Sequence, residues 1–128
     1  MQPSTQPTAP ELEILKLLWH EEPRTAREIH DEIEKVFDWS YSSTRKTLER
    51  MGDKEFIEIQ TQGNKKIYLA KLDKMKTLAT FAQDFAKRVF EMDGPLPVAM
   101  FTDSKLIDDG EIDDLEKLLN DLEKSSKG

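Results

Sequence analysis

Residues 39–51 read Trp-Ser-Tyr-Ser-Ser-Thr-Arg-Lys-Thr-Leu-Glu-Arg-Met, and they are the most informative part of the chain. Thr44, Leu48 and Met51 follow one another at spacings of four and three, which predicts a helix with one buried stripe. Six polar or charged positions point outward on such a helix: Ser42, Ser43, Arg45, Lys46, Glu49 and Arg50. Small polar residues thus open the helix and cations follow, an order that suits contact with a nucleic-acid duplex. The alternative is an ordinary amphipathic surface helix.

A β-hairpin is predicted directly after this helix. Residues 56–61 and 65–69 alternate apolar and polar side chains, and Gln62-Gly63-Asn64 between them has the composition of a turn. A two-stranded hairpin is unstable alone in water, so it must pack on the helices before it. Lys65 and Lys66 then lie at its tip. The layout is that of a winged helix-turn-helix domain, in which the hairpin is the wing.

Two further helices are predicted before this pair. Thr8 with Glu11, and Thr25 with Glu28, have the spacing of a capping box, which marks a helix start. The apolar face of the first helix runs to His20, and the second helix is predicted to bury Ala26, Ile29, Ile33 and Phe37. Residues 1–7 are predicted to form a disordered lead, and residues 8–71 the winged-helix domain.

Residues 72–128 are predicted to form a helical segment. Apolar side chains recur every three or four residues over 72–91, a short helical piece is expected over 95–102, and Asp108 with Glu111 opens a last helix. The apolar faces have too few partners within one copy, which predicts a homodimer. The residues assigned to this dimerisation surface are Phe81, Phe85, Phe90, Ile112, Leu115, Leu118, Leu119 and Leu122. The alternative is that the segment folds back on its own winged domain.

Charge is distributed unevenly along the chain. The formal net charge of −7 opposes DNA binding if it is taken as one number, because phosphate neutralisation supplies much of the affinity of DNA-binding proteins. Residues 1–39 and 72–128 each carry a net charge of −5, whereas residues 40–71 carry seven basic and four acidic side chains, a net +3. The proposed reading helix and wing therefore lie in the only net-positive part.

At residues 39–51 the chain resembles the penicillinase repressor family, the BlaI, MecI and CopY type of bacterial transcriptional regulators. Members typically have a Tyr-Thr-Thr-(apolar)-(basic)-Thr-Leu-Leu-x-Arg-Leu run, which is matched in kind by Tyr41, Ser42, Ser43, Arg45, Leu48, Arg50 and Met51. Lys54-Glu55-Phe56-Ile57 is similar to the family's entry to the wing, with Glu55 in place of glycine. The resemblance extends over residues 9–124 and includes the Glu-(apolar)-x-x-Leu pattern that begins at Glu111.

The resemblance implies an N-terminal winged helix and a helical C-terminal dimerisation segment that together bind palindromic operators and repress transcription. Relatives that respond to β-lactams are released by a protease that cuts an Asn-Phe bond. Met100-Phe101 occupies the corresponding place here, and the Asn is absent. Copper-responsive relatives use a cysteine-rich C-terminus, and this chain has no cysteine, which excludes copper sensing through thiolates.

Other classes of function lack the residues they need. Without cysteine, disulfides and thiolate metal sites are excluded, and His20 and His30 are interpreted as surface or helix-end residues without a third ligand at metal spacing. No phosphate-binding loop and no catalytic triad can be proposed, so we expect no cofactor, no metal and no enzyme activity. The chain has no apolar run of membrane-spanning length and no signal peptide, which predicts a cytoplasmic protein.

The main hypothesis is a homodimeric, DNA-binding transcriptional repressor. Ser42, Ser43, Arg45 and Lys46 would contact the major groove, Arg50 the phosphates, and Lys65 and Lys66 the flanking backbone. The alternative, motivated by the overall acidity, is a protein-interaction adaptor that has a winged fold without DNA binding. The operator sequence, the regulated genes and the inducing signal do not follow from the residues.

Overall fold

The computed structural model describes residues 6–127, with side chains described up to residue 122. The chain divides into two compact units, the first ending at Leu72 and the second beginning at Asp73, next to the boundary expected from the sequence. The predicted disordered lead falls mostly on residues 1–5, outside the described residues. Pro7, at the end of that lead, is buried.

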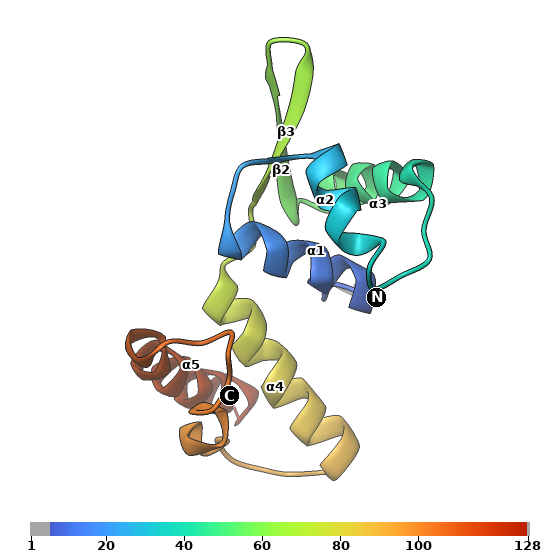
Figure 1. Ribbon diagram of the computed structural model, residues 1–128. Helices are drawn as coiled ribbons and strands as arrows, with labels where there is room; N and C mark the ends of the chain where they lie inside the picture. Colours follow the sequence, from blue (N-terminus) through green and yellow to red (C-terminus); the bar gives the residue numbers. More distant parts are fainter. Residues whose placement is uncertain (1–5, 128) are drawn as a thin grey trace. The chain divides into compact units, whose positions relative to one another are not determined.

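Three helices build most of the first unit: α1 (Ala9–His20), α2 (Ala26–Ile33) and α3 (Tyr41–Asp53) (Figure 1). Both predicted capping boxes are present. The Thr8 backbone N–H donates to Oε1 of Glu11 at 2.8 Å, and that of Thr25 to Oε1 of Glu28 at 2.8 Å. Each cap satisfies backbone donors that a helix start leaves without partners.

The core of the first unit lies where these helices meet. Its fully buried side chains come from all three helices and include the predicted stripe of α3: Ile14, Leu15, Leu18, Ile29, Ile33, Thr44, Leu48 and Met51. Burying each large aliphatic side chain stabilises the fold by roughly 1.5–3 kcal/mol relative to exposure. The second helix is shorter than expected. It ends at Ile33, so Phe37 packs on the core from the following loop, where its ring stacks on Trp39.

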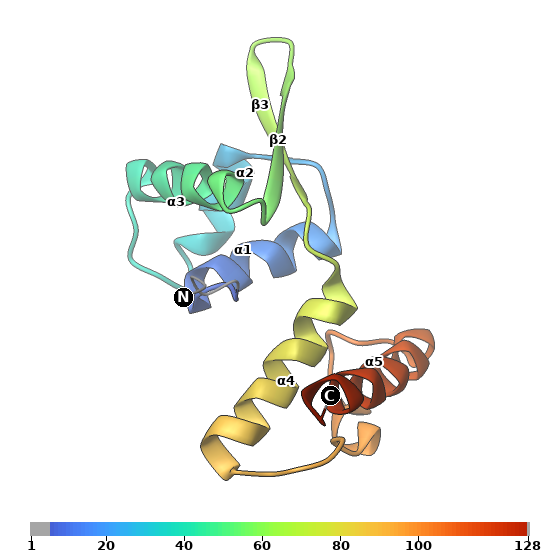
Figure 2. The ribbon, with the colours of Figure 1, turned by 180° about the vertical axis from the view of Figure 1, so that it is seen from behind.

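The sheet of the first unit has three antiparallel strands in the order β1-β3-β2. The predicted hairpin is confirmed as β2 (Ile57–Gln62) and β3 (Lys65–Ala70), joined by Gly63 and Asn64. Gly63 has a φ of 64°, a conformation that glycine adopts without strain. β1 (Arg24–Thr25) was not expected, because two residues carry no alternating pattern. Figure 2 shows the hairpin projecting beyond the helices of its unit.

The second unit contains α4 (Lys74–Phe90), the 3-10 helix η1 (Val98–Phe101) and α5 (Asp109–Lys127). The predicted cap of the last helix is present, with the Glu111 backbone N–H donating to Oδ1 of Asp108 at 2.8 Å. η1 is shorter than the helical piece expected over 95–102. None of the helices in the described part of the chain is long and apolar enough to span a membrane.

The core of the second unit corrects one expectation. Leu115 and Leu119, assigned to the dimerisation surface from the sequence, are each only 1% exposed. They lie in a cluster with Met75, Ala79, Ala86 and Leu96 of the same chain. The leucine stripe of α5 therefore finds part of its partner surface within one copy, because α4 packs against α5. Phe85 and Phe90, by contrast, are 57% and 64% exposed.

Candidate nucleic-acid interface

The helix α3 carries one buried and one exposed face. Ser40 caps its start, with Oγ accepting the Ser43 backbone N–H at 3.1 Å. The inward face is wider than predicted, because Thr47 is buried beside Thr44, Leu48 and Met51. The outward positions are exposed except for half-buried Ser43: Ser42, Arg45, Lys46, Glu49 and Arg50. The polar and cationic face expected from the sequence therefore lies on the surface.

A buried hydrogen bond holds the start of α3 against α2. Nδ1 of His30 lies 2.8 Å from Oγ1 of Thr44, and both side chains are buried. The ring of His30 also meets that of Tyr41 edge to face, with 5.6 Å between their centroids. Of the two interpretations of His30, a surface or a helix-end residue, the second holds, because His30 lies in the last turn of α2 and is buried. The packing of α3 on α2 is what covers it.

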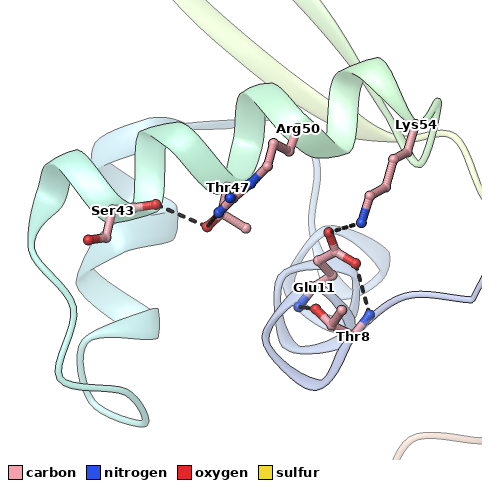
Figure 3. Close-up of polar contacts among 6 residues, drawn as sticks. All are labelled: Thr8, Glu11, Ser43, Thr47, Arg50 and Lys54. Carbon is pink, nitrogen blue, oxygen red and sulfur yellow. Dashed lines mark hydrogen bonds and ion pairs between the residues drawn. The ribbon is translucent and has the colours of Figure 1, made fainter.

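An ion pair holds the other end of α3 (Figure 3). Nζ of Lys54, the residue that caps the helix, lies 2.8 Å from Oε2 of Glu11 in the first turn of α1. Burial raises the pKa of Glu11, but hydrogen bonds from Lys54 and Thr8 and the charge of Lys54 outweigh it, so this pKa lies below its ordinary value. Both ends of α3 are therefore fixed by contacts away from its exposed face.

Apart from Arg27, which stacks on the Tyr41 ring, the cations of the first unit fall into two groups. Those away from the exposed face of α3 and the wing tip have partners within the chain: Lys16 pairs with Glu13, Lys35 with Glu32, Lys54 with Glu11 and Lys71 with Glu55. Nε of Arg24 donates to the Leu17 and Glu21 carbonyls.

The second group consists of the cations that the sequence assigned to DNA. Among the described side chains, no carboxylate forms an ion pair with any of them: Arg45, Lys46, Arg50, Lys65 and Lys66. Arg50 has one hydrogen bond, to the Thr47 hydroxyl at 3.4 Å (Figure 3). Their charges are consequently not neutralised by close pairing within the protein, and they are available to an anionic surface.

Three of these residues line one open pocket of about 380 Å³ between the starts of α2 and α3 and the hairpin. Its lining residues are Thr25, Ala26, Arg27, Tyr41, Arg45, Asn64, Lys65, Lys66 and Tyr68. The structure therefore brings Arg45 together with Lys65 and Lys66, while Ser42, Ser43, Lys46 and Arg50 lie outside this pocket. Arg27 was not found from the sequence, where α2 was read only by its capping pair and its buried stripe.

The described residues contain no group of three or more His, Cys, Asp or Glu side chains that could hold a metal ion. The exposed face of α3 has hydroxyl, guanidinium and ammonium groups, which suit binding to phosphates and base edges.

A three-helix core, a helix with an exposed polar and cationic face, and a hairpin wing with lysines at its tip are the features of winged-helix DNA-binding proteins. Residues 7–121 match the family model described as penicillinase repressor. The chain therefore belongs to the penicillinase repressor family, whose members are DNA-binding transcriptional regulators and not enzymes. This confirms the resemblance noted at residues 39–51.

Among the solved structures that are similar in fold is the solution structure of the DNA binding domain of the repressor BlaI. The TM-score is 0.50 and the sequence identity 24%, and the match covers 58% of this chain and 90% of that one. This likeness confirms the winged-helix fold class. No curated protein matches the chain.

Proposed function

We propose that this chain is a transcriptional repressor that binds a palindromic operator as a homodimer. The observation that carries the proposal is the absence of carboxylate partners, within the described side chains, for the cations on α3 and the wing. Unpaired cations can release counterions from DNA phosphates, which is the main source of non-specific affinity. Residues 8–71 are the proposed DNA-binding domain and residues 72–128 the dimerisation segment.

Each contact residue is assigned a role by its position. Ser42, Ser43, Arg45 and Lys46 lie in the first turns of α3 and would enter the major groove. Arg50, about one turn beyond Lys46, would contact phosphates, and Lys65 and Lys66 would contact the backbone beside the groove. The hydrogen bond between His30 and Thr44 and the ion pair between Lys54 and Glu11 support this assignment, because a reading helix must be held rigidly.

The proposed dimer interface is the apolar face of α4 and its end. Phe85, Val89, Phe90 and Met92 are large apolar side chains that are between 40% and 64% exposed. Phe85 and Phe90 meet edge to face, with 5.7 Å between ring centroids, so they present one joined aromatic surface. A second copy that covers this face would bury it and would link two reading helices, which raises affinity through effective concentration.

Release by proteolysis is not part of the proposal. Met100 is exposed on η1, but it stands where relatives cut by a protease have Asn. The inducing signal is therefore left open.

Titration with random-sequence duplex DNA at low salt tests the DNA-binding part. We expect binding that weakens steeply as salt is added. No binding up to roughly 100 μM, the weak end of non-specific affinities, would remove the repressor proposal in favour of the adaptor. Footprinting on the DNA upstream of the chain's own coding sequence then tests for a two-fold site with half-sites about one helical turn apart.

A further inference from the structure

The pocket between the starts of α2 and α3 and the hairpin is called the wing pocket below. Of the four cations that line it, Arg27 is the one that comes from neither α3 nor the hairpin. It lies in the first turn of α2 and is exposed, and its guanidinium carbon is 4.0 Å from the centroid of the Tyr41 ring. Within the described side chains Arg27 forms no ion pair and no hydrogen bond, so the cation–π contact with the Tyr41 ring is the one interaction of its guanidinium group. Its five N–H donors therefore remain available to a ligand.

Tyr41 is itself held in place. Its ring meets the buried ring of His30 edge to face, and His30 is bonded to Thr44 in the core of the unit. The guanidinium carbon of Arg45 lies 6.0 Å from the centroid of the same ring. An arginine stacked on a fixed aromatic ring loses less side-chain freedom on binding than a free one, so Arg27 is pre-organised.

The chemistry of the pocket selects an anion. Four cations line it, Arg27, Arg45, Lys65 and Lys66, and no carboxylate is among its lining residues. The nearby carboxylate of Glu28 is committed to the capping box, where Oε1 accepts the Thr25 backbone N–H. This hydrogen bond keeps the pKa of Glu28 below its ordinary value against the opposing effect of burial, with further help from the Thr25 side chain and the charges of Arg24 and Lys65.

A phosphate group fits these observations better than a carboxylate does. It presents several acceptor oxygens, and arginine can bind two of them at once through its planar fork. Asn64, Tyr41 and Tyr68 also line the pocket, and their side chains carry neutral hydrogen-bond donors. The volume of about 380 Å³ leaves room for the sugar attached to the phosphate.

We propose that Arg27, held by Tyr41, binds a phosphate group in the wing pocket, and that in the DNA complex this phosphate belongs to the backbone beside the wing. The assignment of the phosphate to DNA rests on the proposed function. Arg27 would then bind the duplex from α2, in addition to the contacts made by α3 and the wing. The same chemistry would serve a free phosphorylated compound, so the two sources must be separated by experiment.

The first arm titrates duplex DNA into the full chain and its Arg27→Gln variant at several salt concentrations. Lys35→Gln is the matched control, because it removes the same charge from an exposed site just after α2 that lies outside the pocket. We expect Arg27→Gln to weaken binding roughly tenfold and to reduce the salt slope by about 0.9, the value for one phosphate contact. Lys35→Gln should keep the wild-type slope, and wild-type affinity and slope in Arg27→Gln would overturn the proposal.

The second arm titrates inorganic phosphate into the full chain and follows the Arg27 side-chain N–H and the Thr25 to Arg27 amides by NMR. We expect saturable shifts that disappear in Arg27→Gln and persist in Lys35→Gln. If these shifts occur while duplex DNA does not bind, the repressor function fails and the phosphate site stands, with a free phosphorylated compound as its ligand. Shifts that are equal in wild type and Arg27→Gln, or absent from both, would overturn the site.

Tyr41 gives a separate test of the positioning role in the first arm. Tyr41→Phe keeps the ring face that Arg27 covers, whereas Tyr41→Leu removes it. We expect Tyr41→Phe to bind DNA with the wild-type salt slope and Tyr41→Leu to bind several-fold more weakly at equal folded fraction, checked by circular dichroism. Equal affinities of the two variants would refute the role of the ring.

Discussion

Nζ of Lys54 lies 2.8 Å from Oε2 of Glu11, and this ion pair joins the end of α3 to the first turn of α1. The Glu11 side chain is 5% exposed and that of Lys54 is 42% exposed. Replacing Lys54 with Met leaves a buried carboxylate without its cation. We expect a loss of about 1–2 kcal/mol in the free energy of unfolding, less than for a fully buried pair because water still reaches Lys54. Urea denaturation measures it.

Lys16→Met is the control for this prediction. Lys16 pairs with Glu13 at 2.9 Å, but both side chains are about one-third exposed. Removing an exposed pair three residues apart on one helix should change the free energy of unfolding by no more than about 0.5 kcal/mol. Equal losses in the two variants would show that Lys54 acts only as a general surface charge.

Glu11 also makes stability depend on pH. Burial raises its pKa, but the contacts of Lys54 and Thr8 prevail, so the pKa in the folded state lies below the ordinary 4.5. A carboxyl whose pKa is lowered by folding contributes stability above its unfolded pKa and loses it as pH falls through the folded value. The gap in unfolding free energy between wild type and Glu11→Gln should therefore be constant above about pH 5 and narrow on further acidification. A gap that widens in acid would contradict the assignment.

Features set by short stretches of sequence could be predicted. The caps at Thr8, Thr25 and Asp108 depend on a residue three positions away, and the hairpin depends on alternation around Gly63. The helix α3 could be predicted because its buried and charged positions repeat at helical spacing.

Features set by contacts between distant segments could not be predicted. β1 exists only because Arg24 and Thr25 meet Tyr68 and Ile67 of β3. The leucine spacing of α5 does not specify which surface covers Leu119, and in the structure α4 of the same chain contributes to that surface. The placement of Arg27 depends on Tyr41, fourteen positions later, through a loop whose path no local pattern specifies.

The buried bond between His30 and Thr44 should contribute to the stability of the first unit. Oε2 of Glu34 lies 3.4 Å from Nε2 of His30, which favours a proton on Nε2 and leaves Nδ1 to accept from the Thr44 hydroxyl. Thr44→Val keeps the shape but leaves Nδ1 without a donor, so we expect a loss of about 1–3 kcal/mol in unfolding free energy. Thr44→Ser keeps the donor and should lose less, about 1 kcal/mol for the missing methyl. The reverse order would mean that packing outweighs the bond.

Substitutions at Phe85 and Leu119 of the second unit should have different effects, one on the association of two chains and the other on the stability of the fold. Phe85 is 57% exposed, so Phe85→Asp should leave the chain folded but convert the proposed dimer to monomer at micromolar concentration. Leu119 is 1% exposed, so Leu119→Ala should lower the stability of its unit by about 2–5 kcal/mol. Sedimentation and thermal unfolding separate the two effects. A wild-type chain that sediments as a monomer at micromolar concentration would refute the dimer.

Replacing both Arg45 and Lys46 with Ala tests the reading face directly. Neither side chain has a carboxylate partner among the described residues, so their removal breaks no ion pair and should leave stability within about 0.5 kcal/mol of wild type. Binding to the operator should fall by at least tenfold, since each side chain is assigned a groove or phosphate contact worth about 1–3 kcal/mol.

Lys65→Gln, at the wing, should instead weaken specific and random duplexes alike and lower the salt slope by about 0.9. Lys16→Gln removes the same single charge as Lys65→Gln, far from this face in sequence, and should leave the DNA affinity and the salt slope unchanged. Unchanged operator affinity in the Arg45 and Lys46 double variant would rule out the assignment of DNA contacts to these two side chains.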